Sequence, residues 1–299
     1  MSNTQMTIPM KLEQDVENAV NYLVNVLLVK TYESETHDAL VVSGWNNDND
    51  TRRAVAVYLV GLCESAIDSG LNIRAALTDD GAEGAFDIYA GVCGIVKESN
   101  SELTNDQKED ERNPWIAEGL WHLCMLAASR KQDIHPLGNI ISVGPAHVRA
   151  KDHGLDGLAI YKASEDTLGL TIIESKAYKL DPNRAINKAV KFFREIDEHK
   201  HSARIKHSVS MMRIALSSDL QELVSGSFWK SVRTYVPNPH YDISENIDWT
   251  NKRPSFENLK TLSKKNILVM PHIIDNFDNF FDEISDNMRD YARGFAINV

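Results

Sequence analysis

Two apolar stretches separated by a short turn decide the fold: His153-Gly-Leu-Asp-Gly-Leu-Ala-Ile-Tyr-Lys162 and Leu168-Gly-Leu-Thr-Ile-Ile-Glu-Ser-Lys176. Their length and their β-branched and aromatic residues are typical of strands. The turn at Ala163–Thr167 is short enough to join them as an antiparallel hairpin. We therefore expect a β-hairpin in which the start of the first strand lies beside the end of the second.

The segments around this hairpin predict an α/β domain. Asn113-Pro114 and Asp181-Pro182 each place a capping side chain before a proline, which is a common way for a helix to begin. Extended segments predict strands around Gly138–Arg149, Leu155–Lys162, Thr167–Lys176, Ser208–Leu216 and Asn266–Met270. The order helix, three strands, helix, strand is typical of a mixed β-sheet flanked by helices.

An acidic and mostly helical N-terminal region is expected at residues 1–112. Apolar residues recur there at helical spacing in Lys11–Lys30, from Asp50 or Thr51 to about Ser69, and in Ala82–Val96. The polar stretch Lys97–Arg112 is the best candidate for a domain boundary, although a solvated helix also fits it. The second domain then covers 113–299, with its core at about 113–216 and a C-terminal extension that ends in an amphipathic helix at about 275–291.

The composition excludes several classes of protein. With 299 residues, of which 42% are hydrophobic and 25% charged, the chain has ordinary globular proportions. Its three cysteines are isolated, which argues against a disulfide framework or a structural zinc site and favours a reducing compartment. The N-terminus lacks a leader pattern and the apolar stretches are too short for a bilayer. We therefore expect a cytoplasmic protein with no membrane partner.

Charge is unevenly distributed along the chain. The net charge is −11, and residues 1–112 alone hold 20 acidic and 8 basic residues. The segment Glu174–Arg213 has the opposite bias, with 10 lysines and arginines against 5 acidic residues. A solvated helix face explains such a segment equally well unless its neighbours indicate an anionic partner.

Three side chains at one end of the hairpin carry the candidate chemistry. Because side chains in a strand alternate, Glu174 and Lys176 share a face, and antiparallel pairing brings Asp156 beside them. Two neighbouring carboxylates repel each other and need a cation, and an all-oxygen site suits Mg²⁺. A lysine beside such a metal can orient or deprotonate a water and stabilise charge on a phosphate. The pattern predicts metal-assisted hydrolysis of a phosphodiester, whereas an exposed edge hairpin with a Glu/Lys pair is the simpler structural explanation.

Further residues fit a nucleic-acid substrate. Arg184, Lys188 and Lys191 recur on one face of the helix after Asp181, and with Lys179 they would line the cleft with positive charge suited to a phosphate backbone. Glu118 stands in an otherwise apolar helix, where it is either a third metal ligand or a partly exposed glutamate favoured by the helix dipole.

Asp156 followed by Glu174-Ser-Lys176, inside this order of elements, resembles the PD-(D/E)xK nuclease superfamily over roughly residues 113–216. The superfamily's proline is replaced by Leu155, and a Gln-x-x-x-Tyr motif after the lysine is absent, which argues against the RecB-like branch. The resemblance implies a restriction-endonuclease-like core in which Asp156 and Glu174 bind Mg²⁺, with Mn²⁺ as a possible substitute, and Lys176 is the catalytic lysine.

The run Glu174-Ser-Lys-Ala-Tyr178, the later Asn187-Lys-Ala189 and the upstream His153-Gly-Leu-Asp156-Gly157 resemble the HamA/AbpA-type nuclease subunits of Hachiman-like anti-phage defence systems. That resemblance implies a DNA-cleaving effector that works beside a HamB-like superfamily 2 helicase. Two alternatives remain open, a stand-alone restriction-type endonuclease and a non-catalytic nuclease-fold scaffold that docks on a partner. The sequence leaves open whether the substrate is double-stranded DNA, single-stranded DNA or RNA.

Overall fold

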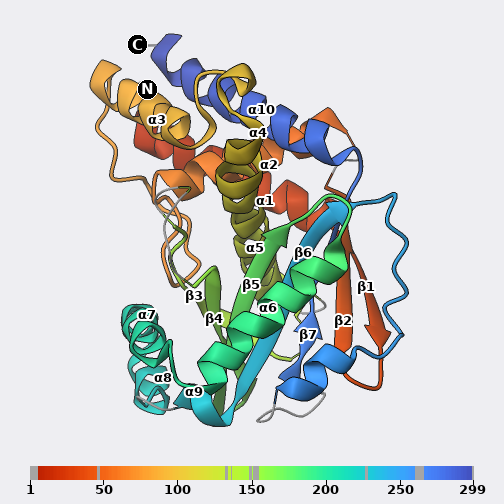
Figure 1. Cartoon of the computed structure of the whole chain (residues 1–299). Coiled ribbons are helices and arrows are strands. Elements are labelled where there is room, and N and C mark those ends of the chain that lie inside the picture. Colours follow the sequence, from red (N-terminus) through yellow and green to blue (C-terminus); the bar gives the residue numbers. More distant parts are fainter. Residues whose placement is uncertain are drawn as a thin grey trace.

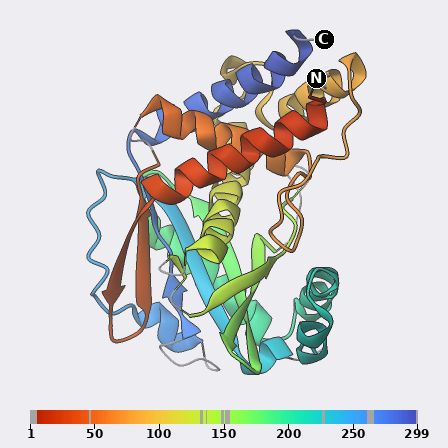
Figure 2. The ribbon, with the colours of Figure 1, turned by 180° about the vertical axis from the view of Figure 1, so that it is seen from behind.

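The computed structural model describes residues 6–45, 48–131, 134–135, 137–147, 150, 155–225, 228–259 and 266–297. It shows a mixed α/β fold in which helices flank both faces of one curled sheet (Figures 1 and 2). The strands are β1 (Leu28–Glu33), β2 (Asp38–Ser43), β3 (Asn139–Val143), β4 (Gly157–Ser164), β5 (Thr167–Ala177), β6 (Arg233–Asp242), β7 (Leu268–Val269) and β8 (His272–Ile274). The helices are α1 (Ile8–Val26), α2 (Asn49–Cys63), α3 (Ala82–Val96), α4 (Asn105–Gln107), α5 (Asn113–Arg130), α6 (Pro182–Asp197), α7 (Ser202–Ile214), α8 (Ser218–Leu223), α9 (Phe228–Ser231) and α10 (Phe277–Ile297). Short 3-10 turns lie at Asn100–Glu102 and Pro254–Asn258.

The sheet has the strand order β1-β2-β8-β6-β5-β4-β3, with β7 paired to β2. Strands β3, β4 and β5 form an antiparallel meander, so the predicted hairpin is present. Helix α6 then crosses one face of the sheet, and β6 returns parallel to β5. The predicted order of helix, three strands and helix is therefore found in α5, β3, β4, β5 and α6, whereas the strand that follows is β6, reached only after α7, α8 and α9.

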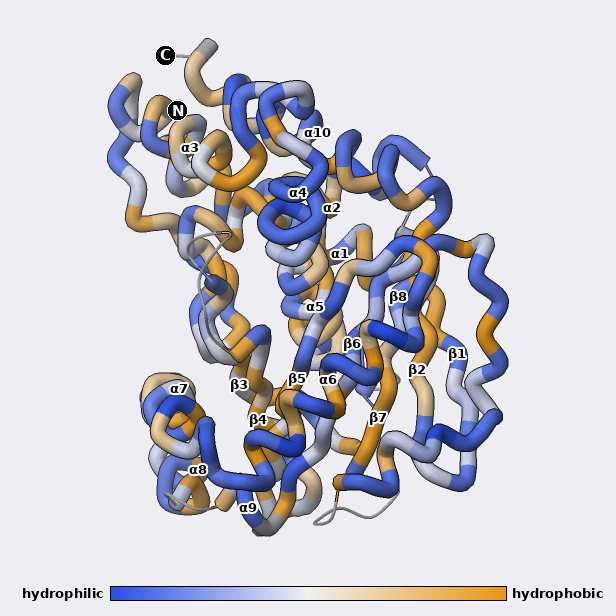
Figure 3. Tube along the Cα trace, viewed as in Figure 1, coloured by the Kyte–Doolittle hydropathy of each residue, from blue (hydrophilic) through white to orange (hydrophobic). Residues whose placement is uncertain are grey.

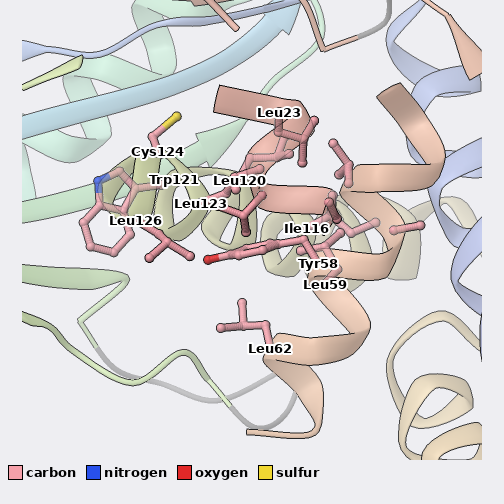
Figure 4. Packing of buried hydrophobic residues seen from close by; sticks show 14 of the residues in the cluster. Leu23, Tyr58, Leu59, Leu62, Ile116, Leu120, Trp121, Leu123, Cys124 and Leu126 are labelled. Carbon is pink, nitrogen blue, oxygen red and sulfur yellow. The ribbon is translucent and has the colours of Figure 1, made fainter. Parts of the chain in front are cut away.

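Each face of the sheet has its own apolar cluster. On one face, α1, α2, α5 and α10 pack together, and Figure 4 shows side chains such as Leu23, Leu59 and Leu120 meeting there. On the other face, α6 and α7 cover the apolar side chains of β4 and β5. Along α6 the tube in Figure 3 alternates between hydrophilic and hydrophobic residues, as expected for a helix with one buried face.

The predicted start of α6 is confirmed. The Asp181 carboxylate accepts a hydrogen bond from the Arg184 N–H at 2.8 Å, and Pro182 occupies the first turn. Its buried stripe includes Ile186, Ala189 and Phe193, which face the sheet. The C-terminal amphipathic helix is likewise present as α10.

The N-terminal region contains two strands besides its helices. Strand β1 begins within Lys11–Lys30, where the spacing predicts helix throughout, so that part of the helix prediction was wrong. Strand β2 has four consecutive buried residues and pairs in parallel with β8. These strands extend the same sheet that contains the hairpin, and the region's helices join the apolar cluster formed by α5 and α10.

The strand predicted at Ser208–Leu216 was wrong, because these residues lie mostly in helix α7. The buried side chains are Ile205, Val209, Met212 and Leu216, at spacings of four, three and four residues. That is the period of a helix, and it becomes visible only when the window begins at Ile205.

The last strand of the core is β6, which begins after the predicted end of the core at about residue 216. The segment Pro237-Asn-Pro239-His240, whose composition is typical of a turn, lies inside this strand. Proline removes a backbone donor and is rare in central strands. Here the Pro237 carbonyl accepts a hydrogen bond from the Met270 N–H at 2.9 Å. Pro237 therefore faces the break in the sheet between the end of β7 at Val269 and the start of β8 at His272. The Asn238 side-chain amide donates to the Met270 carbonyl at 2.6 Å and supplies a donor at that break.

Helix α5 does not start at an Asn113 cap, because a π-helical turn at Lys108–Arg112 leads directly into it. The predicted boundary at Lys97–Arg112 is thus a series of short helical turns. Among the residues that the structure describes, no helix combines the length and the hydropathy needed to cross a membrane.

Candidate active site

The end of the hairpin brings Asp156, Glu174 and Lys176 together. Asp156 directly precedes β4, whose first residue pairs with Ile173 of β5. The Asp156 carboxylate accepts from the Ser175 backbone N–H at 2.8 Å and lies 3.1 Å from the Lys176 ammonium. The same ammonium lies 2.7 Å from the Glu174 carboxylate.

Gly157 allows this arrangement by letting α5 approach β4. A Cβ atom at this position would lie 2.3 Å from the indole ring of Trp121, far inside van der Waals contact. Trp121 is only 2% exposed and occupies the space that a side chain at Gly157 would need. The residue after Asp156 must therefore be glycine for the strand to lie against α5.

Glu118 joins this group from α5. Its carboxylate lies 2.8 Å from Nδ1 of His147, and the Trp115 indole N–H donates to the His147 carbonyl at 2.9 Å. Burial raises the pKa of Glu118 to about 7, partly opposed by His147, and the nearby Asp156 carboxylate raises it further. Glu118 is thus a partly buried acid, with 15% of its side chain exposed, next to the hairpin cluster.

The site contains more negative charge than its cation can balance. Burial raises the pKa of Glu174 to about 8, and repulsion from Asp156 adds to this shift while Lys176 opposes it. The Lys176 pKa is raised above its usual range because its two carboxylates outweigh the cost of burial. Two carboxyl groups therefore contact a single ammonium, with Glu118 as a third nearby, and burial favours the protonated form of Glu118 and Glu174.

This donor set fits a divalent cation such as Mg²⁺. Carboxylate oxygens are its preferred protein ligands, and a second cation relieves the repulsion that raises the pKa of Glu174 and Glu118. Asp156 and Glu174 would hold the ion, with Glu118 as a further carboxylate. Within the described ranges, no three His, Cys, Asp or Glu side chains are already spaced around a common point.

The predicted basic residues separate into three environments. Arg184 and Lys188 of α6 lie over the ring of Tyr178, at 5.1 and 4.9 Å from its centroid, and Lys188 also contacts the Tyr178 hydroxyl. Lys191 is exposed farther along α6. Lys179 is 2.5 Å from Asp278 of α10, so its charge is already paired. Arg184 and Lys188 thus flank the chain where it leaves β5.

Two residues that contact the candidate site residues were not predicted from the sequence, namely His147 and Tyr178. No sequence pattern links His147 to Glu118, and only the fold shows that the two side chains are in contact. Tyr178 was quoted only as part of a motif, and the i, i+4 spacing of Arg184 and Lys188 was the available signal that both could reach one ring. His153, which belongs to the quoted motif, lies outside the described residues.

No protein-family model matches the chain, and no curated protein matches it significantly.

Proposed function

We propose that this chain is a metal-dependent nuclease that hydrolyses phosphodiester bonds in DNA, with Mg²⁺ as its cofactor and Mn²⁺ as a substitute. The observation that carries the proposal is the meeting of Asp156, Glu174 and Lys176 at the hairpin end, with Glu118 beside them. A buried cluster with excess carboxylates costs stability, which a metal-binding function explains. A core of one helix, three antiparallel strands and a crossover helix, followed after α7, α8 and α9 by β6 parallel to β5, also supports a PD-(D/E)xK assignment.

The residues divide the chemistry among them. A bound Mg²⁺ would supply a Lewis acid for the phosphate and an activated water. Asp156 and Glu174 hold the ion, and the Ser175 N–H fixes the orientation of Asp156. Lys176 remains an ammonium because its pKa is raised, so it stabilises negative charge that develops on the phosphate.

The exposed cations of α6 fit the binding of the polynucleotide. Arg184, Lys188 and Lys191 are all exposed on the helix that follows the catalytic strand. Phosphate contacts of this kind position a strand without reading its sequence. Lys179 would join them only after its ion pair with Asp278 opens.

We further propose that the chain is the effector of a bacterial anti-phage complex and acts beside a superfamily 2 helicase. The support is the resemblance at Glu174–Tyr178 together with the acidic residues 1–112, which a basic partner surface would complement. Co-purification with a helicase encoded next to this chain is the expected result, and a monomer with no such neighbour would count against the defence role.

Plasmid cleavage tests the nuclease. Wild-type protein with Mg²⁺ or Mn²⁺ should cleave, and EDTA, Glu174→Ala and Lys176→Ala should each abolish cleavage. Matched controls come from exposed positions on the same hairpin, Glu165→Ala and Lys162→Ala, which should cleave like the wild type.

Cleavage that survives in both site variants would place the active centre elsewhere or indicate a contaminant. If no variant and no wild-type protein cleaves, the assay is repeated with the helicase and its nucleotide. Continued inactivity then rules out the nuclease and favours a scaffold.

A further inference from the structure

A cavity of about 140 Å³ adjoins the candidate active site and has no role in the mechanism above. His147 lines this cavity and also contacts the Glu118 carboxylate at 2.8 Å. His122, which lines it too, lies one turn after Glu118 on α5. The cavity and the catalytic carboxylates are therefore neighbours along a single helix face.

His122 presents a neutral hydrogen-bond donor to the cavity. The side chain is 4% exposed, and burial lowers its pKa to about 4. Its Nδ1 lies 2.7 Å from the Tyr58 hydroxyl, which has no other hydrogen-bond partner among the described residues. Tyr58 therefore donates to Nδ1, and the ring proton of His122 resides on Nε2. Nε2 remains available to a ligand in the cavity.

The described lining residues suit a neutral ring better than a phosphate. None of them is a lysine or arginine, whereas Asp68 is one of them. The Asp68 carboxylate is already engaged by the N–H groups of Gly70 and Asn72 and by Arg74. Leu62, Ile67 and Val143 are among its apolar walls.

The size of the cavity selects a single ring. An engineered cavity of about 150 Å³ in another protein holds one benzene molecule. A space of about 140 Å³ therefore fits a six-membered ring but is small for a purine. A pyrimidine has that size, and its carbonyl oxygens accept hydrogen bonds such as the one offered by His122.

We infer that this cavity binds an unpaired pyrimidine base of the strand whose phosphodiester lies at Asp156, Glu174 and Lys176. This inference rests on the proposed nuclease function and specifies its substrate class as single-stranded nucleic acid. A base inside a duplex is stacked and paired, so its entry into this cavity would require base flipping. Unpaired strands avoid that cost.

The test measures binding in Ca²⁺, a divalent ion chosen to replace Mg²⁺, by fluorescence anisotropy. Labelled oligo(dT), oligo(dA) and a duplex of equal length are the probes. Wild-type protein should bind oligo(dT) about tenfold more tightly than the other two. Ala146→Leu fills the cavity and His122→Phe removes the Nε2 donor, so both variants should lose that preference. Ala203→Leu, an exposed control on α7, should keep it.

Equal binding of the three probes by wild-type protein, absence of binding, or a preference that survives in both cavity variants would overturn the inference. Thermal melting of each variant separates loss of the cavity from loss of the fold. Cleavage of a single-stranded circular DNA, tested beside the plasmid, separates this inference from the nuclease itself. Cleavage without a pyrimidine preference would support the proposed nuclease and refute the proposed base site. A cavity-dependent preference without cleavage would support the base site and refute the nuclease.

Discussion

At the scale of single residues, the candidate site is defined by an imbalance of charge. Lys176 lies between Asp156 and Glu174 and is the only ammonium that contacts them in the described part of the chain. Glu118 adds a third carboxylate, and the pKa of Glu118 and of Glu174 is raised chiefly by burial. Such an arrangement destabilises the metal-free protein and is relieved when a cation binds.

This imbalance predicts a metal-dependent gain in thermal stability. MgCl₂ at saturating concentration should raise the melting temperature of the wild type by about 3 °C or more, because binding to the native state alone stabilises it by about 2–3 kcal/mol. Glu174→Gln should melt above the wild type without metal, since it removes a buried carboxylate, and should lose most of the shift with Mg²⁺.

Differential scanning fluorimetry in EDTA and in MgCl₂ measures both effects. Glu165→Gln, on the exposed turn of the same hairpin, is the matched control and should shift like the wild type. An equal Mg²⁺ shift in Glu174→Gln would mean that the ion binds elsewhere.

At the scale of elements, local signals made some parts predictable. The Asp181 cap, Pro182 and the stripe of apolar residues all indicated α6. The alternation of side chains along a strand placed Glu174 and Lys176 on one face of β5. The hairpin register then brought Asp156 beside them, so the central geometry of the site could be derived from the sequence.

Other elements depend on contacts that are distant in sequence. Strand β6 contains two prolines, and only the break between β7 and β8 makes them tolerable in a central strand. Strand β2 pairs with the C-terminal β8, about 230 residues away, and β1 joins the sheet through β2. No local pattern reports such a partner, and the contact between His147 and Glu118 was missed for the same reason.

The packing of α5 against β4 yields a prediction at this scale. Gly157→Ala would drive a methyl group into Trp121, so we expect a loss of about 1–3 kcal/mol in the free energy of unfolding. Because Asp156 precedes this residue, plasmid cleavage should fall as well. Urea denaturation and the cleavage assay measure the two losses.

Gly94→Ala on α3 is the matched control. Nothing lies within 4 Å of a Cβ atom there, and alanine favours a helix interior, so stability should stay equal or rise slightly. Trp121→Phe combined with Gly157→Ala should recover part of the lost stability, since the smaller ring leaves room. A Gly157→Ala protein as stable and as active as the wild type would contradict the proposed close packing.

At the scale of the whole molecule, one core crosses the boundary expected between residues 112 and 113. Leu59 of α2 lies 2.2 Å from the position of a Cβ atom at Gly119 of α5, so the two helices are in close contact. The buried Arg289 of α10 donates to the carbonyls of Val96 and Lys97 at the end of α3. The side of the acidic region that packs against α5 and α10 therefore belongs to the core, and only the solvent-facing side of this region is available to a partner.

This continuity predicts that residues 113–299 do not fold alone. Without residues 1–112, the buried face of α5 and part of α10 would be exposed to water, and the sheet would lose β1 and β2. At about 25 cal/mol for each Å² of apolar surface exposed, about 600 Å² would offset the 5–15 kcal/mol by which domains are stable. The fragment should show no cooperative thermal transition by circular dichroism, whereas co-expression with a separate 1–112 chain should restore one. A cooperative transition in the fragment alone, near that of the intact chain, would instead establish residues 113–299 as an independent domain and the acidic region as an accessory to it.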